Sequence, residues 1–154
     1  VFKKTLAMGY ILSYGAHTFE LFAYRTWSFA LFFFIGNSTT PKISIGLITA
    51  IVSSITITGM IASIVGAKIA ERHLRNKVIS LVGICTFLTS LVCAIALNTF
   101  MIAIIALWIY NFFIMLDSGA LTAGAVESSD DHNRGAVLAV HSMVGFLVEH
   151  LVAQ

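Results

Sequence analysis

Residues 67–77, AKIAERHLRNK, form the only dense block of charge in the chain, and a long apolar run flanks the block on each side. The block holds four of the nine basic residues: Lys68, Arg72, Arg75 and Lys77. In membrane proteins, short loops that are rich in Lys and Arg stay on the cytoplasmic side. We therefore predict that residues 67–77 are a cytoplasmic loop between two membrane-spanning segments, and this loop fixes the side of every other segment.

The composition excludes an ordinary water-soluble domain. Of the 154 residues, 58% are apolar and 10% are charged, and the mean hydropathy is +0.95. Soluble domains carry about 25% charged residues, so we expect the lipid bilayer to be the main partner of this chain. The basic loop accounts for the net charge of +2, which therefore gives no reason to expect a nucleic-acid partner.

Five apolar runs follow one another along the sequence, at residues 6–34, 43–69, 78–97, 100–126 and 136–154. A helix needs about 20 apolar residues to cross a bilayer, and each run is about that long or longer. Backbone groups in lipid must be satisfied within the segment, and these runs are far longer than barrel strands. The sequence predicts a single all-α membrane domain with five transmembrane helices.

The charges and polar turns predict how the spans are oriented. Lys3 and Lys4 precede the first run and favour a cytoplasmic N-terminus. The polar turns at 36–42 and 98–99 then lie outside, the acidic segment 127–135 lies inside, and the C-terminus lies outside. The chain begins at Val1 and ends within an apolar run, so we expect it to be a piece of a longer chain.

Ionisable residues inside the runs are the first candidates for function. The candidates are His17, Glu20 and Arg25 in the first run, Asp117 in the fourth and His141 in the fifth, where Glu149 and His150 also lie. A charge at the centre of a membrane helix costs about 2.5–3.5 kcal/mol on insertion scales, so such residues are functional candidates by default.

The first run holds the strongest of these candidates. His17 and Glu20 are three residues apart and share a helix face. We predict that Glu20 is a proton or substrate site and that Arg25 is its ion-pair partner or an anion contact. The alternative is that these residues are structural charge pairs between helices. Asp117 could likewise carry protons or only hold the packing.

Small residues in the second run predict close helix packing, because Gly59, Ser63 and Ala67 recur every four residues on one helix face. We find no nucleophile elbow, no metal-ligand spacing such as His-Glu-x-x-His and no phosphate-binding glycine loop in the sequence. We therefore expect no catalytic residues, no metal and no cofactor.

The basic block resembles the loop signature of the major facilitator superfamily, Gly-x-Leu-Ala-Asp-Arg-x-Gly-Arg-Arg. The matching residues are Ile69, Ala70, Glu71, Arg72 and Arg75, and the departures are Ala67, Leu74 and Asn76. Residues 14–27, 116–124, 134–136 and 141–146 are similar to the seventh, tenth and eleventh spans of a bacterial group in this superfamily. The resemblance covers essentially the whole chain.

This resemblance implies five of the six helices of a C-terminal transporter half, spans seven to eleven, in the bacterial inner membrane. The activity implied is secondary active transport of a small solute by alternating access, coupled to protons or another ion. The other half would belong to the same chain or to a separate one. In the family the acid and the arginines of the loop latch the halves together, so Glu71, Arg72 and Arg75 would gate the cytoplasmic side. Alternatively, the loop is only a positive-inside anchor.

Two functions of other classes stay open. One is a non-transporting membrane scaffold or an inactive transporter fragment. The other is an integral-membrane enzyme, which would need His and acidic residues clustered at one depth. His17, Asp117 and His141 come from separate runs, which disfavours the enzyme.

Overall fold

The computed structural model describes residues 2–38, 42–96 and 99–152, and these residues form helices joined by short turns, without a strand. The fold is therefore all-α, as the sequence predicts. The centres of the two predicted external turns, residues 39–41 and 97–98, lie outside the described residues. In chain order the helices are α1 (Phe2–Asn37), α2 (Ile45–Arg72), α3 (Arg75–Ala96), α4 (Phe100–Leu116), α5 (Ser118–Glu127), the short 3-10 helix η1 (Asp131–Asn133) and α6 (Arg134–Val152).

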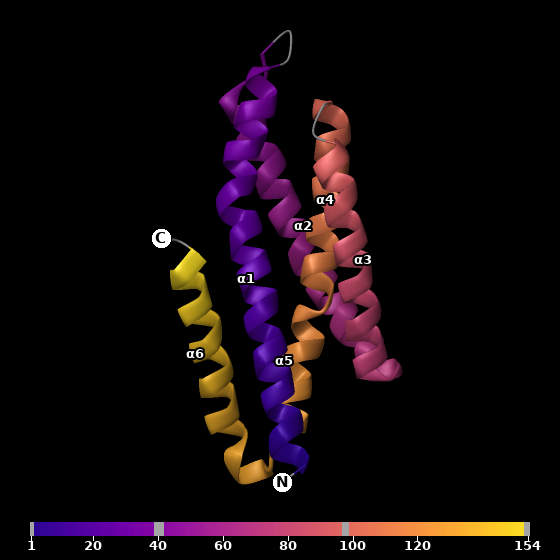
Figure 1. The fold of residues 1–154 in the computed structure, drawn as a ribbon, viewed down its shortest axis with the longest axis vertical. Coiled ribbons are helices and arrows are strands. Elements are labelled where there is room, and N and C mark those ends of the chain that lie inside the picture. Colours follow the sequence, from indigo (N-terminus) through magenta and orange to yellow (C-terminus); the bar gives the residue numbers. More distant parts are fainter. Residues whose placement is uncertain (1, 39–41, 97–98, 153–154) are drawn as a thin grey trace.

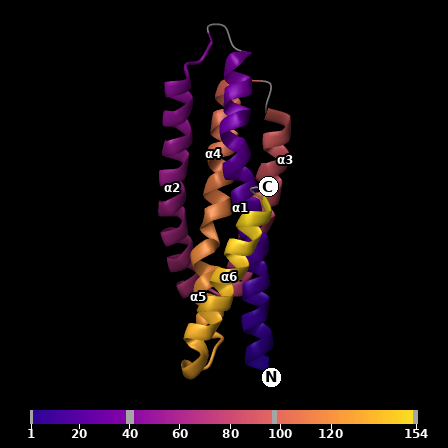
Figure 2. The same cartoon turned by 90° about the vertical axis from the view of Figure 1, so that its left-hand side faces the viewer.

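The helices form one elongated bundle whose long axis is that of α1 (Figure 1). α6 packs beside α1, while α4 packs between α2 and α3 on the other side of the bundle (Figures 1 and 2). The N-terminus, the α2–α3 turn and the α5–α6 connection lie toward one end, and the α1–α2 and α3–α4 connections lie toward the other (Figure 1). Successive connections therefore alternate between the two ends, the pattern expected of a multi-pass membrane protein.

Four helices are long and apolar enough to cross a membrane, namely Ile45–Arg72, Arg75–Ile95, Phe100–Glu127 and Asp131–Val152. These helices indicate a multi-pass membrane protein. α1 has 36 residues but is not among the four. His17, Glu20 and Arg25 interrupt its apolar sequence, so the predicted crossing at 6–34 stays a prediction.

The helices extend into the predicted loop 67–77. α2 continues to Arg72 and α3 begins at Arg75, so that only His73 and Leu74 separate them. Lys and Arg are good helix formers, and a basic residue in the last turn of a helix interacts favourably with the helix dipole. The charged block therefore lies mostly on the ends of two helices, and Leu74 at the turn is 67% exposed.

Some of the large apolar side chains are buried in a core between the helices, and many others are exposed on the outside of the bundle. The core fills the contacts of α4 with α1, α2 and α3, where Phe32, Ile48, Ile55 and Ile114 are almost fully buried. Large apolar side chains are also exposed on the outside of the bundle, as in α3, where Ile95 is 79% exposed. Such an exterior suits lipid and would be costly in water.

α2 crosses α4 and α5 at short range through the small residues of one face. A Cβ on Gly59 would lie 2.8 Å from Asn111 Nδ2, and a Cβ on Gly119 would lie 2.8 Å from the Ala67 Cβ. A Cβ on Gly66 would collide with the Leu116 carbonyl. The structure thus places the predicted packing face of Gly59, Ser63 and Ala67 against α4 and α5, and Gly66 is a closer contact that the sequence analysis did not single out.

The fourth predicted run is one apolar stretch in sequence but two helices in the structure. Asp117 ends α4 and precedes α5, with φ of −91° and ψ of −15°. The backbone bends at the point where the Leu116 carbonyl lies against Gly66. A carboxylate therefore lies at a helix break inside the bundle.

Candidate functional site

The helix break brings Asp117 against His17 of α1. His17 Nδ1 lies 2.9 Å from Asp117 Oδ1, and the two side chains are 4% and 17% exposed. The distance is that of an ion pair when the imidazole is protonated. The sequence analysis named both residues but did not predict that they would meet.

His141 of α6 joins the same cluster through Tyr14. The Tyr14 ring stacks on His141 with the ring centroids 3.7 Å apart, and it stacks on His17 with the centroids 5.8 Å apart. His141 Nε2 lies 3.1 Å from the Thr122 hydroxyl of α5. The expectation that His17, Asp117 and His141 are scattered is therefore wrong, because the α4–α5 break and the packing of α6 on α1 bring these residues of three helices together.

Two atoms of this cluster are buried without a hydrogen-bond partner. They are Asp117 Oδ1 and His141 Nδ1. Asp117 Oδ1 is close to His17 Nδ1, but the two atoms are not aligned as a hydrogen bond. Buried polar atoms are nearly always paired in native proteins, so such exceptions call for an explanation. We take up their role below.

Glu20 lies in a second polar contact on α1. The Tyr110 hydroxyl of α4 donates a hydrogen bond of 2.6 Å to Glu20 Oε1. Arg25 is exposed, with its guanidinium carbon 5.7 Å from the centroid of the Phe22 ring. The predicted Glu20–Arg25 pair is therefore absent, since five residues of helix turn the two side chains in different directions.

Glu20 and Asp117 line one cavity of about 260 Å³. Its remaining lining residues are Ile114 of α4 and Gly83, Thr86, Phe87 and Ser90 of α3. The two carboxylates come from different helices and are far apart in sequence. The structure thus brings together Glu20 and Asp117, whose proximity could not be predicted from the sequence.

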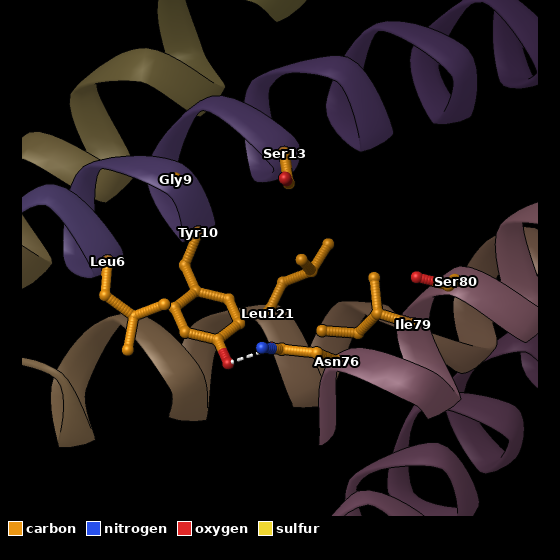
Figure 3. A pocket seen from close by; sticks show the side chains of 8 residues that line it. All are labelled: Leu6, Gly9, Tyr10, Ser13, Asn76, Ile79, Ser80 and Leu121. Atoms are coloured by element: carbon orange, nitrogen blue, oxygen red, sulfur yellow. Dashed lines mark hydrogen bonds between the residues drawn. The ribbon is translucent and has the colours of Figure 1, made fainter. Parts of the chain in front are cut away.

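A second cavity, of about 230 Å³, lies between α1 and α3 nearer the N-terminus (Figure 3). The Tyr10 hydroxyl donates a 2.6 Å hydrogen bond to Asn76 Oδ1 there, and Ser13 and Ser80 also line the cavity (Figure 3). Over the described residues the backbones of α1 and α3 do not contact each other. Both cavities are lined by residues of α1 and of α3, and they have no lining residue in common.

The predicted gating residues separate into two environments. Glu71 and Arg72 are exposed at the end of α2. Arg75 Nη1 and Nη2 donate to both carboxylate oxygens of Glu127, at 2.7 and 2.9 Å. Arg75 thus ties the start of α3 to Glu127, the last residue of α5.

Tyr14, Tyr110 and Thr122 are the site residues that the sequence analysis missed. Tyr14 precedes His17 by three residues, and this spacing places both on one helix face. That signal was available in the sequence. Tyr110 and Thr122 carry no such signal, because only the tertiary packing brings them to Glu20 and His141.

Among the described residues, no group of three His, Cys, Asp or Glu side chains, the cluster of His17, Asp117 and His141 included, is placed so that it could hold a metal ion. What the arrangement offers is acid–base chemistry by carboxylates and imidazoles in an apolar bundle. Comparisons with protein-family models, with curated proteins and with solved structures give no match to this chain.

Proposed function

We propose that the chain forms most of one half of a secondary active transporter of the major facilitator type. In this proposal α1 is a fifth crossing helix, the N-terminus is cytoplasmic, and the other half lies in the same chain or in a separate one. The transporter moves a small solute, coupled to an ion gradient. The loop resemblance and the alternation of connections between the two ends of the bundle support this proposal.

The single observation that carries the proposal is the pair of carboxylates in one cavity. Glu20 and Asp117 line the same space within a bundle of apolar helices. Ionisable residues in such surroundings are costly and mark substrate or ion pathways. Asp117 also lies at a helix break, and transporters often build their sites from broken helices near the middle of the bilayer.

A membrane enzyme would need His and acidic residues close together, and His17, Asp117 and His141 meet that condition. This cluster therefore counts in favour of the enzyme alternative. His17 and His141 are only 6% and 3% exposed, however, and an enzyme must admit its substrate to the catalytic groups. A scaffold would gain nothing from the cost of these buried groups. Ion-coupled transport uses them, because protons and small ions reach sites that larger substrates do not.

The test is uptake by the full protein in liposomes under an imposed pH gradient, with sets of labelled sugars, amino acids and organic anions. Glu20→Gln removes one charge from the cavity and keeps the shape of the side chain. We expect its uptake to fall to the level of empty liposomes, with the amount of inserted protein unchanged. Glu149→Gln of α6 is the matched control and should keep wild-type uptake.

Wild-type uptake in Glu20→Gln would overturn the role of the cavity. If the wild-type protein transported none of the labelled sugars, amino acids or organic anions, we would reject the transporter proposal in favour of a non-transporting scaffold.

A further inference from the structure

We infer that His17, Asp117 and His141 form a single proton-binding site and that the proton is the coupling ion. This inference rests on the proposed function, and it assigns the proton to this cluster in preference to Glu20. Tyr14 and Thr122 complete the cluster as positioning residues.

In this proposal His17 and Asp117 hold the proton in one state of the site. The 2.9 Å separation of Nδ1 and Oδ1 places a protonated imidazole directly against a carboxylate in a buried setting. A buried charge is tolerated when an opposite charge accompanies it. One bound proton therefore leaves the pair neutral overall, and no covalent bond other than the N–H or O–H bond changes when the proton is transferred.

His141 offers the second place for the proton. Its Nε2 contacts the Thr122 hydroxyl, whereas its Nδ1 is buried and has no hydrogen-bond partner. The Tyr14 ring lies between the two imidazoles and stacks on both. An unpartnered basic nitrogen this deep in the bundle is explained if it accepts a proton during part of the cycle.

The surrounding charges allow one positive imidazole at a time. Asp117 is the only acidic partner within ion-pair distance of either ring among the described residues. Glu20 lies one helix turn beyond His17 and is engaged by the Tyr110 hydroxyl of α4. Two imidazolium ions beside one carboxylate would leave an uncompensated buried charge.

The other packed elements add no charge at the cluster. The α3 residues that line the cavity are Gly83, Thr86, Phe87 and Ser90, none of them ionisable in the range where histidine titrates. α2 meets this region through Ser63 and Ala67, which contact Gly119. The ionisable groups of this region are therefore His17, His141 and Asp117, with Tyr14, Glu20 and Tyr110 as neighbours.

The test reads the charge of each ring directly. The full protein is labelled with ¹⁵N-histidine and placed in lipid nanodiscs, and ¹⁵N shifts are followed from about pH 5 to about pH 9, the range in which histidine changes charge. Single His→Gln variants assign the signals. We expect that His17 and His141 are never both charged at any pH in the wild-type protein.

Substitutions then test whether the two rings share one proton. His141→Gln and Asp117→Asn should each shift the titration midpoint of His17 by about one pH unit or more, as for strongly interacting sites. Glu149→Gln, a carboxylate on α6 outside the cluster, should leave both midpoints in place. Asp117→Glu should restore the wild-type behaviour, which a purely structural role of Asp117 would not require.

Simultaneous charging of both rings, or an unchanged His17 midpoint in His141→Gln, would overturn the inference. The His141→Gln result decides the matter if Asp117→Asn does not fold. The titration needs no substrate, so its failure is distinct from failure of the transporter proposal. Uptake without coupled titration would indicate another coupling ion, and coupled titration without uptake would leave a proton site on a protein that is not a transporter.

Discussion

Gly66 has no side chain, and this allows α2 to lie close to the backbone at the candidate site. α2 lies so close to the α4–α5 break that a Cβ at this position would collide with the Leu116 carbonyl. The break places the carboxylate of Asp117, the next residue, inside the bundle. The acid therefore lies directly beside the point where a residue of another helix comes closest to the backbone.

We predict that Gly66→Ala destabilises the protein by about 1–3 kcal/mol, the usual cost of overpacking. Loss of helical circular dichroism on heating in detergent measures the effect. Gly83→Ala is the matched control, because a Cβ on Gly83 has nothing within 4 Å. A Gly66→Ala protein as stable as Gly83→Ala would mean that the two helices cross less closely than the structure has them.

At the scale of single residues, the sequence indicated which groups matter but not how they pair. His17, Glu20, Asp117 and His141 stand out because polar groups are rare in apolar runs. Their partners depend on the rotation of whole helices, which no local pattern encodes. Glu20 illustrates this limit, since its hydrogen-bond partner is Tyr110 of α4, 90 residues away in sequence.

Among the secondary-structure elements, the sequence predicts the helices well and their interruptions poorly. The apolar run at 100–126 has no Pro, and its break falls at Asp117-Ser118-Gly119, a short stretch of turn-forming residues that was not predicted to interrupt the run. The break lies where α2 comes close to the Leu116 carbonyl. The loop at 67–77 was predicted too long for the opposite reason, because its charged residues are also good helix formers.

The ion pair between α3 and α5 gives a prediction at this scale. Arg75 contacts both oxygens of Glu127, whose side chain is 62% exposed. A double-mutant cycle with Arg75→Gln and Glu127→Gln should give a coupling free energy of about 0.2–1 kcal/mol, as for other exposed pairs. Thermal unfolding of the four proteins measures it.

Salt should reduce this coupling, because exposed charges are screened. A coupling free energy that stays constant from low to high salt would instead indicate a buried pair, with α5 packed more tightly on α3 than the structure shows.

At the scale of the whole molecule, the charge pattern gives a topology that labelling can test. In a protein whose Cys85 and Cys93 are replaced by serine, a cysteine is introduced at Leu74 or at Ser38, which lie at opposite ends of the bundle. We expect a membrane-impermeant maleimide to label position 38 from outside intact cells, and position 74 only after the cells are opened. The basic residues around position 74 are the physical reason.

The opposite labelling pattern would invert the topology, and labelling of both positions from outside would show that α2 does not cross the membrane.

If α1 crosses the membrane, as we propose, its length has a consequence for the membrane around the protein. Its 36 residues extend about 54 Å, against a hydrocarbon layer of about 30 Å. Such a mismatch is relieved by tilting the helix or by deforming nearby lipid. A thicker bilayer would favour a more upright α1, and α1 carries Tyr14, His17 and Glu20 with it. Bilayer thickness therefore acts on one wall of the candidate site while α5 and α6 hold the other.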